Sequence, residues 1–489
     1  GDIYRKVIGF SSNEYNKFST ASLITRSTND VQQVQMTMAM MFRIVLYAPI
    51  IGIGGVLRVL ETDSSMTWIL GVGVVLILVI IGLLFSIAMP RFTKLQTLID
   101  RLNLVTREIL TGIPVIRAFS REKHEEDRFE DANKVLTKTN LFVNRCMTFM
   151  MPSMMLIMNG ISVLIVYNGS YAVDAGNMQV GDMMAFIQYA MQIIMAFLMI
   201  TAMSIMLPRA NVAAMRIVEI LETENSLKEP EAPVHPSQEI KGTVEFDHVS
   251  FAYPDAGENV LTDISFKAEK GQTLAVIGST GSGKSSLINL IPRFYDVTQG
   301  CVKVDGVDVR SMSQKELRDR LGYVPQKGVL FSGTIDSNIR YGKTDISEEQ
   351  VKKAAMVAQA QDFIEEKPHG YESPVAQGGT NVSGGQKQRL SIARAVAKDP
   401  EIFIFDDSFS ALDFKTDKAL RKALKEHTKN ATTIIVAQRI STILNADQIL
   451  VLDDGKMAGL GTHRELMENC EVYRQIAMSQ LSEEELANE

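Results

Sequence analysis

The segment Gly278–Ser285 carries residues whose types and spacing suit phosphate binding. Its letters, GSTGSGKS, follow the pattern G-x-x-x-x-G-K-S, in which glycines let backbone N–H groups close around phosphate oxygens. The pattern lies between a β-rich run, Thr273–Ile277, and a helical run, Ser285–Ile291, so a helix N-terminus adds its positive dipole end to the loop. We expect Lys284 to reach the β- and γ-phosphates of a nucleotide and Ser285 to bind Mg²⁺. The residues predicted to bind the nucleotide here are Gly278, Ser279, Thr280, Gly281, Ser282, Gly283, Lys284, Ser285 and Ser286.

A second element of the same chemistry is the run Ile402–Asp406. Four consecutive apolar residues predict a buried strand, and a carboxylate at its end suits a metal ion held beside the phosphates. Asp406 therefore joins Ser285 as a predicted metal ligand. The alternative, a buried strand that merely ends in a capping Asp, is disfavoured by the phosphate-binding pattern upstream.

Both elements lie in the half of the chain that begins at about residue 241. Short β-rich runs alternate there with helical patterns, which predicts an α/β domain over 241–489 with a parallel sheet and crossover helices. The preceding segment, 221–240, is polar and has Pro230, Pro233 and Pro236 at every third position. This spacing favours an extended linker.

The first 220 residues have a different composition. Three stretches contain no charged residue, namely Ser64–Pro90, Cys146–Val173 and Met183–Pro208, and each exceeds the roughly 20 residues that cross a bilayer. A weaker apolar segment, 36–57, is interrupted by Arg43 and Pro49. We therefore predict a transmembrane domain over 1–220 with four spans, at about 36–57, 66–90, 146–173 and 183–208, and exclude a wholly soluble protein.

The charges between the spans predict their orientation. Residues 91–145 carry eleven Lys and Arg, residues 58–66 carry one and residues 174–182 carry none. Since basic residues accumulate on the cytoplasmic side, we expect a multi-pass protein of the cell (cytoplasmic) membrane with both chain ends in the cytoplasm. Apolar residues at helical spacing in 91–145 predict two helices that continue the spans and join near Gly112–Pro114. A separate small helical domain is the alternative.

Methionines follow one face of the last span. Met191, Met195, Met199 and Met203 are spaced by four, and flexible thioethers suit apolar ligands of different shapes. Helix packing or lipid contact is the alternative.

Two composition counts exclude other functions. The net charge of −7 gives no overall basic surface for nucleic acid, and three scattered cysteines support neither a zinc cluster nor a disulfide framework.

Further motifs carry a resemblance to a known family. The octapeptide Val382–Arg389, VSGGQKQR, closely resembles the signature sequence of ATP-binding cassette (ABC) proteins. Tyr253 in FAYP resembles that family's adenine-stacking aromatic residue, Gln326 in GYVPQ resembles its Q-loop, and Ser410–Asp413 resembles its D-loop. Residues 18–30 and 111–129 are similar to the two intracellular connections of the family's exporters, which carry coupling helices.

The resemblance implies a type I ABC exporter-like, α-helical transmembrane domain followed by an α/β P-loop NTPase domain, the ABC nucleotide-binding domain. Because such exporters usually have six spans per subunit, we expect an N-terminal truncation that removes roughly the first two spans. The resemblance also implies that Gln326 acts at the metal and in catalysis.

Three positions depart from the family pattern. Asp407 stands where the family places the Glu that activates the attacking water, and Gln438 stands where its switch-loop His is expected. The shorter carboxylate retreats by more than about 1 Å, and a displacement of about that size can cost ~10²-fold in a positioned reaction. Gln cannot hold a proton against the γ-phosphate. An active ATPase that tolerates both changes is the alternative. Gln377 replaces a Glu that many relatives carry before the signature.

Cassettes of this family hold each ATP between the phosphate-binding loop of one subunit and the signature of the other. The resemblance therefore implies one half of a heterodimeric bacterial multidrug exporter that binds ATP and Mg²⁺ in a degenerate site of its own. Its Ser383, Gly384, Gly385 and Gln386 would complete the competent site of a partner subunit with the intact Glu and His. The expected surroundings are a lipid bilayer and a hydrophobic small-molecule substrate. Two alternatives are a regulatory ATP-binding subunit of a gated pathway and a homodimeric lipid or peptide exporter.

Overall fold

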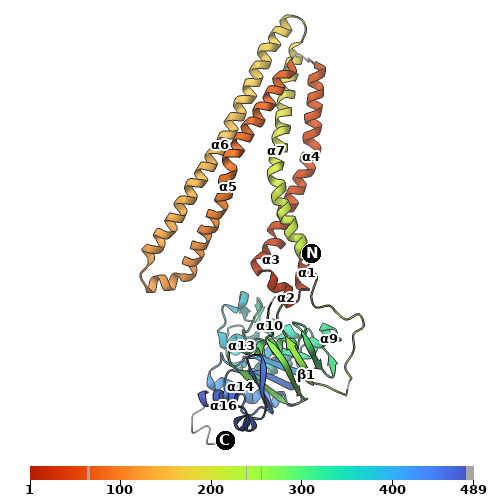
Figure 1. The fold of residues 1–489 in the computed structure, drawn as a ribbon, viewed down its shortest axis with the longest axis vertical. Coiled ribbons are helices and arrows are strands. Elements are labelled where there is room, and N and C mark those ends of the chain that lie inside the picture. The colour runs from red at the N-terminus through yellow and green to blue at the C-terminus, as the bar shows by residue number, and fades with distance from the viewer. Residues whose placement is uncertain (63–65, 238, 255, 481–489) are drawn as a thin grey trace. The chain divides into compact units, whose positions relative to one another are not determined.

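The computed structural model describes residues 1–62, 66–237, 239–254 and 256–480, and its chain divides into two compact units (Figure 1). One unit comprises residues 21–222 and is helical. The other joins residues 1–20 to the chain from residue 223 onward. The first twenty residues thus belong to the compact unit that contains the phosphate-binding pattern, although the apolar spans follow them directly in the sequence.

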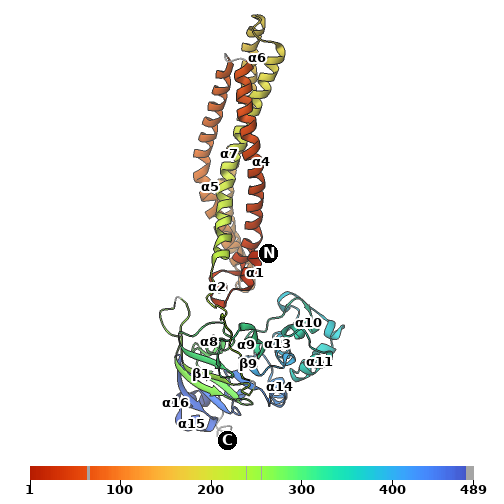
Figure 2. The ribbon, with the colours of Figure 1, turned by 90° about the vertical axis from the view of Figure 1, so that its right-hand side faces the viewer.

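The helical unit is built from four long helices that pack in pairs. Helix α4 lies along α7, and α5 lies along α6 (Figures 1 and 2). Buried apolar side chains fill the unit, among them Ile69, Ile165 and Phe186. Within the described residues, four helices are long and apolar enough to cross a membrane. Ser64 and Ser65 of the first charge-free stretch lie outside those residues. The helices are α3 (Thr20–Ser27), α4 (Asn29–Thr62), α5 (Thr67–Ala118), α6 (Glu122–Asp174) and α7 (Val180–Glu222).

Helices α5 and α6 extend far beyond the predicted spans. They contain 52 and 53 residues, so each is about 80 Å long at ~1.5 Å per residue. The predicted joint at Gly112–Pro114 is wrong, because α5 continues through Pro114 to Ala118. The chain turns at Ser120, whose φ is +50°, and the Arg121 N–H closes the helix end by donating to the Ile116 carbonyl over 2.9 Å. A proline breaks only one main-chain hydrogen bond, which leaves enough helix on either side to continue.

The methionine face of α7 points away from the packing within its own unit. Ile193 and Ile194 are buried, whereas the next residue, Met195, is 47 % exposed. Met191 and Met199 are partly exposed, and the side chain of Met203 lies outside the described ones. The apolar face that holds α7 in this chain is therefore formed by isoleucines and not by the predicted methionine stripe.

Two short helices and the linker form one edge of the other unit. Helices α1 (Asp2–Ile8) and α2 (Ser12–Lys17) precede the membrane region. The buried Glu14 accepts hydrogen bonds from the Ser11 hydroxyl and, over 3.1 Å, from the Ser226 N–H; these two bonds hold the pKa of the Glu14 carboxyl below its ordinary value although burial opposes them.

The linker has no helix or strand between Thr223 and Thr243 in its described residues, as its prolines predicted, but it is bonded to the domain that follows. The Val234 N–H donates to the Ser311 carbonyl over 2.8 Å, and His235 Nδ1 lies 2.8 Å from Glu316 Oε2. The segment is therefore an extended strap on the domain surface.

The remaining chain forms two main sheets. A four-stranded antiparallel sheet has the order β2-β1-β4-β5, and a six-stranded sheet has the order β12-β11-β3-β10-β9-β6. All neighbouring strands of the second sheet are parallel except β12 and β11. The strands are β1 (Val244–Phe251), β2 (Leu261–Ala268), β3 (Thr273–Gly278), β4 (Gln299–Val304), β5 (Val307–Asp308), β6 (Leu321–Val324), β7 (Gly333–Thr334), β8 (Pro374–Val375), β9 (Ile402–Asp406), β10 (Thr432–Val436), β11 (Gln448–Asp453) and β12 (Lys456–Gly461).

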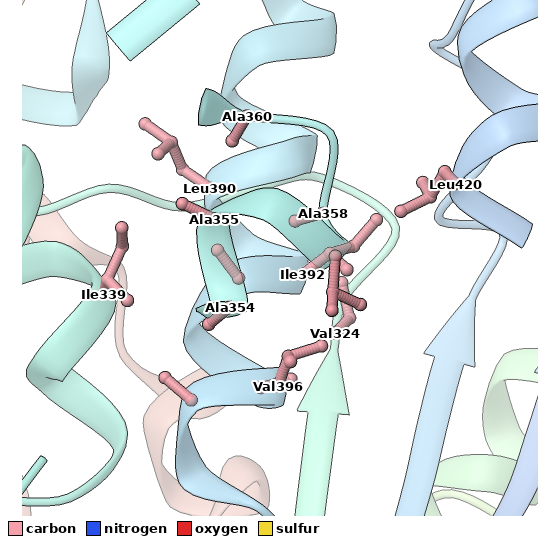
Figure 3. Close-up of a cluster of buried hydrophobic side chains, with 14 of the residues drawn as sticks. Val324, Ile339, Ala354, Ala355, Ala358, Ala360, Leu390, Ile392, Val396 and Leu420 are labelled. Carbon is pink, nitrogen blue, oxygen red and sulfur yellow. The ribbon is translucent and has the colours of Figure 1, made fainter. Parts of the chain in front are cut away.

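Helices cover the parallel sheet and fix the loops at its edge. Figure 3 shows Leu390, Ile392 and Val396 of α13 packed with Ala354 of α11 and Val324 at the end of β6. This cluster is a continuous apolar core, so the segments after β6 and before α13 are held in fixed positions. The helices are α8 (Lys284–Leu290), α9 (Gln314–Asp319), α10 (Ile335–Ile339), α11 (Glu348–Val357), α12 (Gln361–Glu365), α13 (Gly384–Lys398), α14 (Phe414–His427), α15 (His463–Asn469) and α16 (Glu471–Gln480).

Candidate nucleotide-binding site

The residues predicted to bind phosphate and metal and to act in catalysis lie at the carboxyl edge of the parallel sheet. Strand β3 ends at Gly278 and enters the phosphate-binding loop. The strands that follow β3 across the sheet, β10, β9 and β6, end at Val436, Asp406 and Val324. Each of these four neighbouring strands thus delivers one predicted motif to the same edge. The carboxyl edge of an open parallel sheet is where such folds bind ligands.

The phosphate-binding loop depends on two glycines with left-handed backbone. Gly281 has φ +88° and Gly283 has φ +93°, a region that side chains other than glycine rarely adopt. A Cβ atom on Gly283 would also lie 2.8 Å from Leu261 Cδ2. The loop therefore requires glycine at position 283 for space as well as for conformation.

Lys284 follows the loop and lies against it. Its Nζ donates to the Gly278 and Ser279 carbonyls over 2.8 and 2.6 Å. Burial lowers the pKa of Lys284, while the negative charges of Asp407 and Asp406 raise it in part. The ammonium is thus held at the centre of the loop, at the start of helix α8 where anions bind.

The two predicted metal ligands from separate motifs are in contact. The Ser285 hydroxyl donates to Asp406 Oδ1 over 3.2 Å. Asp406 is 6 % exposed, and this burial raises its pKa above the ordinary value, with the Ser285 hydrogen bond opposing the shift. The oxygen atoms of Ser285 and Asp406 therefore face one another across the loop.

Asp407, which follows Asp406, is hydrogen-bonded to the segments that follow strands β10 and β6. Its Oδ2 accepts a hydrogen bond from Gln438 Nε2 over 2.8 Å and another from Gln326 Nε2 over 3.3 Å. Asp407 is 9 % exposed and has φ +45°, which turns its side chain out of the strand direction toward both amides. The three residues predicted as catalytic are thus joined at one oxygen atom.

The predicted adenine contact lies beside the phosphate-binding loop. The Tyr253 hydroxyl lies 2.8 Å from Ser286 Oγ, and the Tyr253 ring packs edge-on against Phe251 and Tyr295, with centroids 4.9 and 5.1 Å away. The aromatic ring is therefore fixed next to the first turn of α8.

The predicted signature residues stand apart from this cluster. Ser383 caps α13, accepting from Gln386 N over 3.3 Å, while Gln386 Oε1 accepts from Ser383 N over 3.2 Å. Gly384 is exposed, and a Cβ atom there would meet nothing within 4 Å. Among the described residues, no hydrogen bond joins Ser383 or Gln386 to the phosphate-binding loop. The start of α13 is an open helix N-terminus with two small residues.

Two contacting residues of the site were not predicted. Gln388 of α13 is buried and donates to the Pro325 carbonyl over 3.2 Å, next to Gln326. Gln480 donates to the Gln438 carbonyl over 2.9 Å. Gln388 lies within the resembled octapeptide, which could have marked it, whereas nothing in the sequence around Gln480 points to the switch segment.

Comparison with known proteins identifies the family. Residues 261–410 match the family described as ABC transporter, and residues 1–197 match the family described as ABC transporter transmembrane region. An ABC transporter ATP-binding protein of Mycobacterium tuberculosis is 43% identical over 481 residues, which cover 98% of this chain and 82% of the relative. This chain belongs to the ABC exporters. A bacterial Atm1-family ABC exporter solved with ATP bound has a TM-score of 0.81 and 26% identity, covering 98% of this chain and 84% of that chain.

A further relative of this ABC exporter bears a more specific name. A Bacillus subtilis protein named "Probable multidrug resistance ABC transporter ATP-binding/permease protein YheI" is 33% identical over 476 residues, covering 94% of this chain and 79% of that protein.

The family confirms the predicted fold class and general activity. A helical transmembrane domain precedes an ABC nucleotide-binding domain that binds ATP, and the ABC exporter is an ATPase coupled to transport, embedded in a membrane with its ATPase domain in the cytoplasm.

Proposed function

We propose that this ABC exporter chain is one half of a heterodimeric exporter and that ATP bound at its own loop is hydrolysed slowly. The observation that carries the proposal is the pair of amide hydrogen bonds to Asp407 Oδ2. A carboxylate that activates water must offer a lone pair to that water, and here both amide donors occupy lone pairs of the same Asp407 oxygen. A positioned base contributes about 10²–10⁴-fold, and this is the order of the expected loss.

The exposed start of α13 supports the second part of the proposal. Ser383, Gly384 and Gly385 present a helix N-terminus outward, where backbone N–H groups favour phosphate. A partner subunit that carries the Glu and His missing here would place its ATP against this end. The partner site would then be the faster of the two.

The residues of the site fit a magnesium ion. Mg²⁺ is held in nucleotide enzymes by one or two carboxylates together with phosphate oxygens and water, and Asp406 and Ser285 supply a buried carboxylate and a hydroxyl in contact. The amide oxygen of Gln326 is the third predicted ligand. When bound, the ion would neutralise charge on the phosphates.

The transported compounds are proposed to be hydrophobic or amphipathic. The exposed thioethers of α7 offer an adaptable apolar surface, and the name of the Bacillus subtilis relative refers to multidrug resistance. Movement against a gradient separates a pump from a gated pathway: uphill, ATP-dependent accumulation of the amphipathic dye ethidium in inverted vesicles supports the pump, and purely downhill flux contradicts it.

The slow site is tested with the full chain purified alone in lipid nanodiscs. We expect low ATP hydrolysis, which rises by at least about tenfold in the double variant Asp407→Glu with Gln438→His. Asp406→Asn in the double variant is the control and removes the gain, since it removes the metal carboxylate. Fast hydrolysis by the unaltered chain, or a double variant no faster than its parent, contradicts the proposal.

A further inference from the structure

The last described residue of the chain, Gln480, touches the switch segment, which we define as residues 437–442 after β10. Its side-chain Nε2 donates to the Gln438 carbonyl over 2.9 Å, and its Oε1 accepts from the Ile440 N–H over 2.8 Å. A single carboxamide therefore holds the main chain on both sides of Arg439. No motif of the sequence assigns a role to this residue or to helix α16.

Helix α16 is anchored firmly enough to act as a support. Tyr473 and Ala477 are fully buried, and they share an apolar cluster with Ala437 and Ile440 of the switch segment. The Tyr473 hydroxyl also lies 2.7 Å from His463 Nδ1. Residues 473, 477 and 480 are spaced by four and three, so they lie on one face of the helix. The face that enters the core thus also presents Gln480 to the loop.

The contacts form a chain that leads to the nucleotide site. Gln480 holds the Gln438 backbone, and the Gln438 side chain donates to Asp407 Oδ2 over 2.8 Å. On the far side, Arg421 of α14 donates to the Ser441 carbonyl over 2.8 Å. The end of β10 fixes the start of the segment, because the Ala437 N–H donates to Val276 of β3 over 3.1 Å.

We propose that Gln480 is a positioning residue for the switch segment: it sets the place from which residue 438 reaches the nucleotide and its neighbour Asp407. Because Gln480 bonds to the backbone of residue 438, the role is the same whichever side chain stands there. The inference therefore does not depend on the site being slow.

The test measures single-turnover hydrolysis of ATP with the full chain in excess, both in the unaltered protein and in the Asp407→Glu, Gln438→His background. Single turnover reports the rate of the bound nucleotide even when that rate is low. Gln480→Met keeps the length of the side chain and removes both hydrogen bonds. We expect the rate constant to fall by about three- to tenfold, with ATP affinity and thermal midpoint unchanged, since displacement of a positioned group lowers rate more than binding. The matched control is Gln475→Met, because Gln475 lies on the same helix and its side chain, among the described residues, hydrogen-bonds to Glu471 within that helix.

A second variant separates positioning from a general loss of stability. Gln480→Glu keeps the acceptor for the Ile440 N–H and loses the donor to the Gln438 carbonyl. Amide hydrogen exchange at Ile440, followed in peptides covering 438–442, should be faster in Gln480→Met and close to that of the parent in Gln480→Glu. Both variants should hydrolyse ATP more slowly than the parent. The proposal is overturned if Gln480→Met hydrolyses ATP as fast as Gln475→Met. It is also overturned if the slower hydrolysis is accompanied by weaker ATP binding or a lower thermal midpoint.

Discussion

Gln438 Nε2 lies 2.8 Å from Asp407 Oδ2, and this hydrogen bond joins the ends of the neighbouring parallel strands β10 and β9. Because a carboxylate only accepts hydrogen bonds, the amide must turn its NH₂ group to Asp407. Gln326, after β6, does the same at the same oxygen. Asp407 and Gln438, the two residues that depart from the family pattern, therefore form one unit in which the amide donates and the carboxylate accepts.

This unit predicts that Asp407 contributes little to hydrolysis at its own site. In Asp407→Asn, the side-chain oxygen can still accept from both amides, so the packing is preserved while the charge is lost. We expect single-turnover hydrolysis by the chain alone to stay within about twofold of the parent. A base that activates water would instead lose about 10²–10⁴-fold.

The matched control is the neighbouring Asp406→Asn. Asp406 contacts Ser285, so its loss should weaken magnesium-dependent ATP binding, measured by equilibrium titration with and without Mg²⁺. A drop of more than tenfold in Asp407→Asn would show that Asp407 acts as a base after all.

A second prediction concerns the cap of the signature helix. Ser383→Ala removes the side-chain acceptor of the Gln386 N–H, and the loss of such a cap costs about 1 kcal/mol. Helix α11 offers an equal motif, in which Ser347 and Gln350 form the same reciprocal pair. Ser347→Ala should therefore lower the thermal midpoint by a similar amount.

The two variants should differ in turnover. In the complex of this chain with its partner subunit, Ser383→Ala is expected to lower ATP hydrolysis, whereas Ser347→Ala leaves it unchanged. Equal turnover in both variants would remove the proposed role of the α13 start at a partner's nucleotide.

A third prediction separates conformation from space in the phosphate-binding loop. Both Gly281 and Gly283 have left-handed φ, but a Cβ atom on Gly281 meets nothing within 4 Å, while one on Gly283 meets Leu261 at 2.8 Å and the Val260 carbonyl at 3.0 Å. We expect Gly283→Ala to weaken ATP binding by more than about tenfold and Gly281→Ala by less, because only the former adds a clash to the strain of about 1–2 kcal/mol. Fluorescence titration with a labelled ATP analogue measures both, and equal losses contradict the structural distinction.

Local patterns indicate the candidate site residues but not the contacts that support them. The strand, loop and helix around Lys284 are contiguous in the sequence, and an apolar strand before Asp406 fixes where that carboxylate lies. Three prolines predicted an extended linker, but the bond from Val234 to Ser311 joins positions far apart and leaves no local signal. The same holds for Gln480, which reaches Gln438 across 42 positions. Long-range contacts are decided by packing, which a pattern within one segment does not contain.

The turn between α5 and α6 shows the limit of reading a proline as a boundary. Pro114 lies inside α5. The long helix α6 packs along α5, and this packing stabilises α5 although the proline removes one main-chain hydrogen bond. The chain reverses where Ser120 adopts a left-handed conformation. Serine is not the residue that a search for such turns would select.

The last prediction concerns the stability of the ATP-binding domain in acid. His427 ends helix α14. Its Nε2 is buried with no hydrogen-bond partner in the part of the chain that the structure describes, and it lies 3.9 Å from Asp399 Oδ1. Burial lowers the pKa of His427, and the positive charge of Lys353 lowers it further, while Asp399 opposes both. In the unfolded chain a histidine titrates near its ordinary value of about 6.5. Below that pH the unfolded chain binds a proton that the folded domain does not, so the free energy of unfolding decreases as the pH falls, by at most about 1.4 kcal/mol per pH unit for this one group.

The measurement compares thermal midpoints of the parent and of His427→Asn between pH 7.5 and 5.5. The parent should lose more stability than the variant below about pH 6.5, and the two curves should run parallel above it, where histidine is neutral in both states. Every other titrating group is common to the two proteins, so the difference between the curves isolates His427. Curves that stay parallel down to pH 5.5 would mean that the His427 ring accepts its proton in the folded domain as readily as in the unfolded chain, with Asp399 compensating fully for burial and for Lys353.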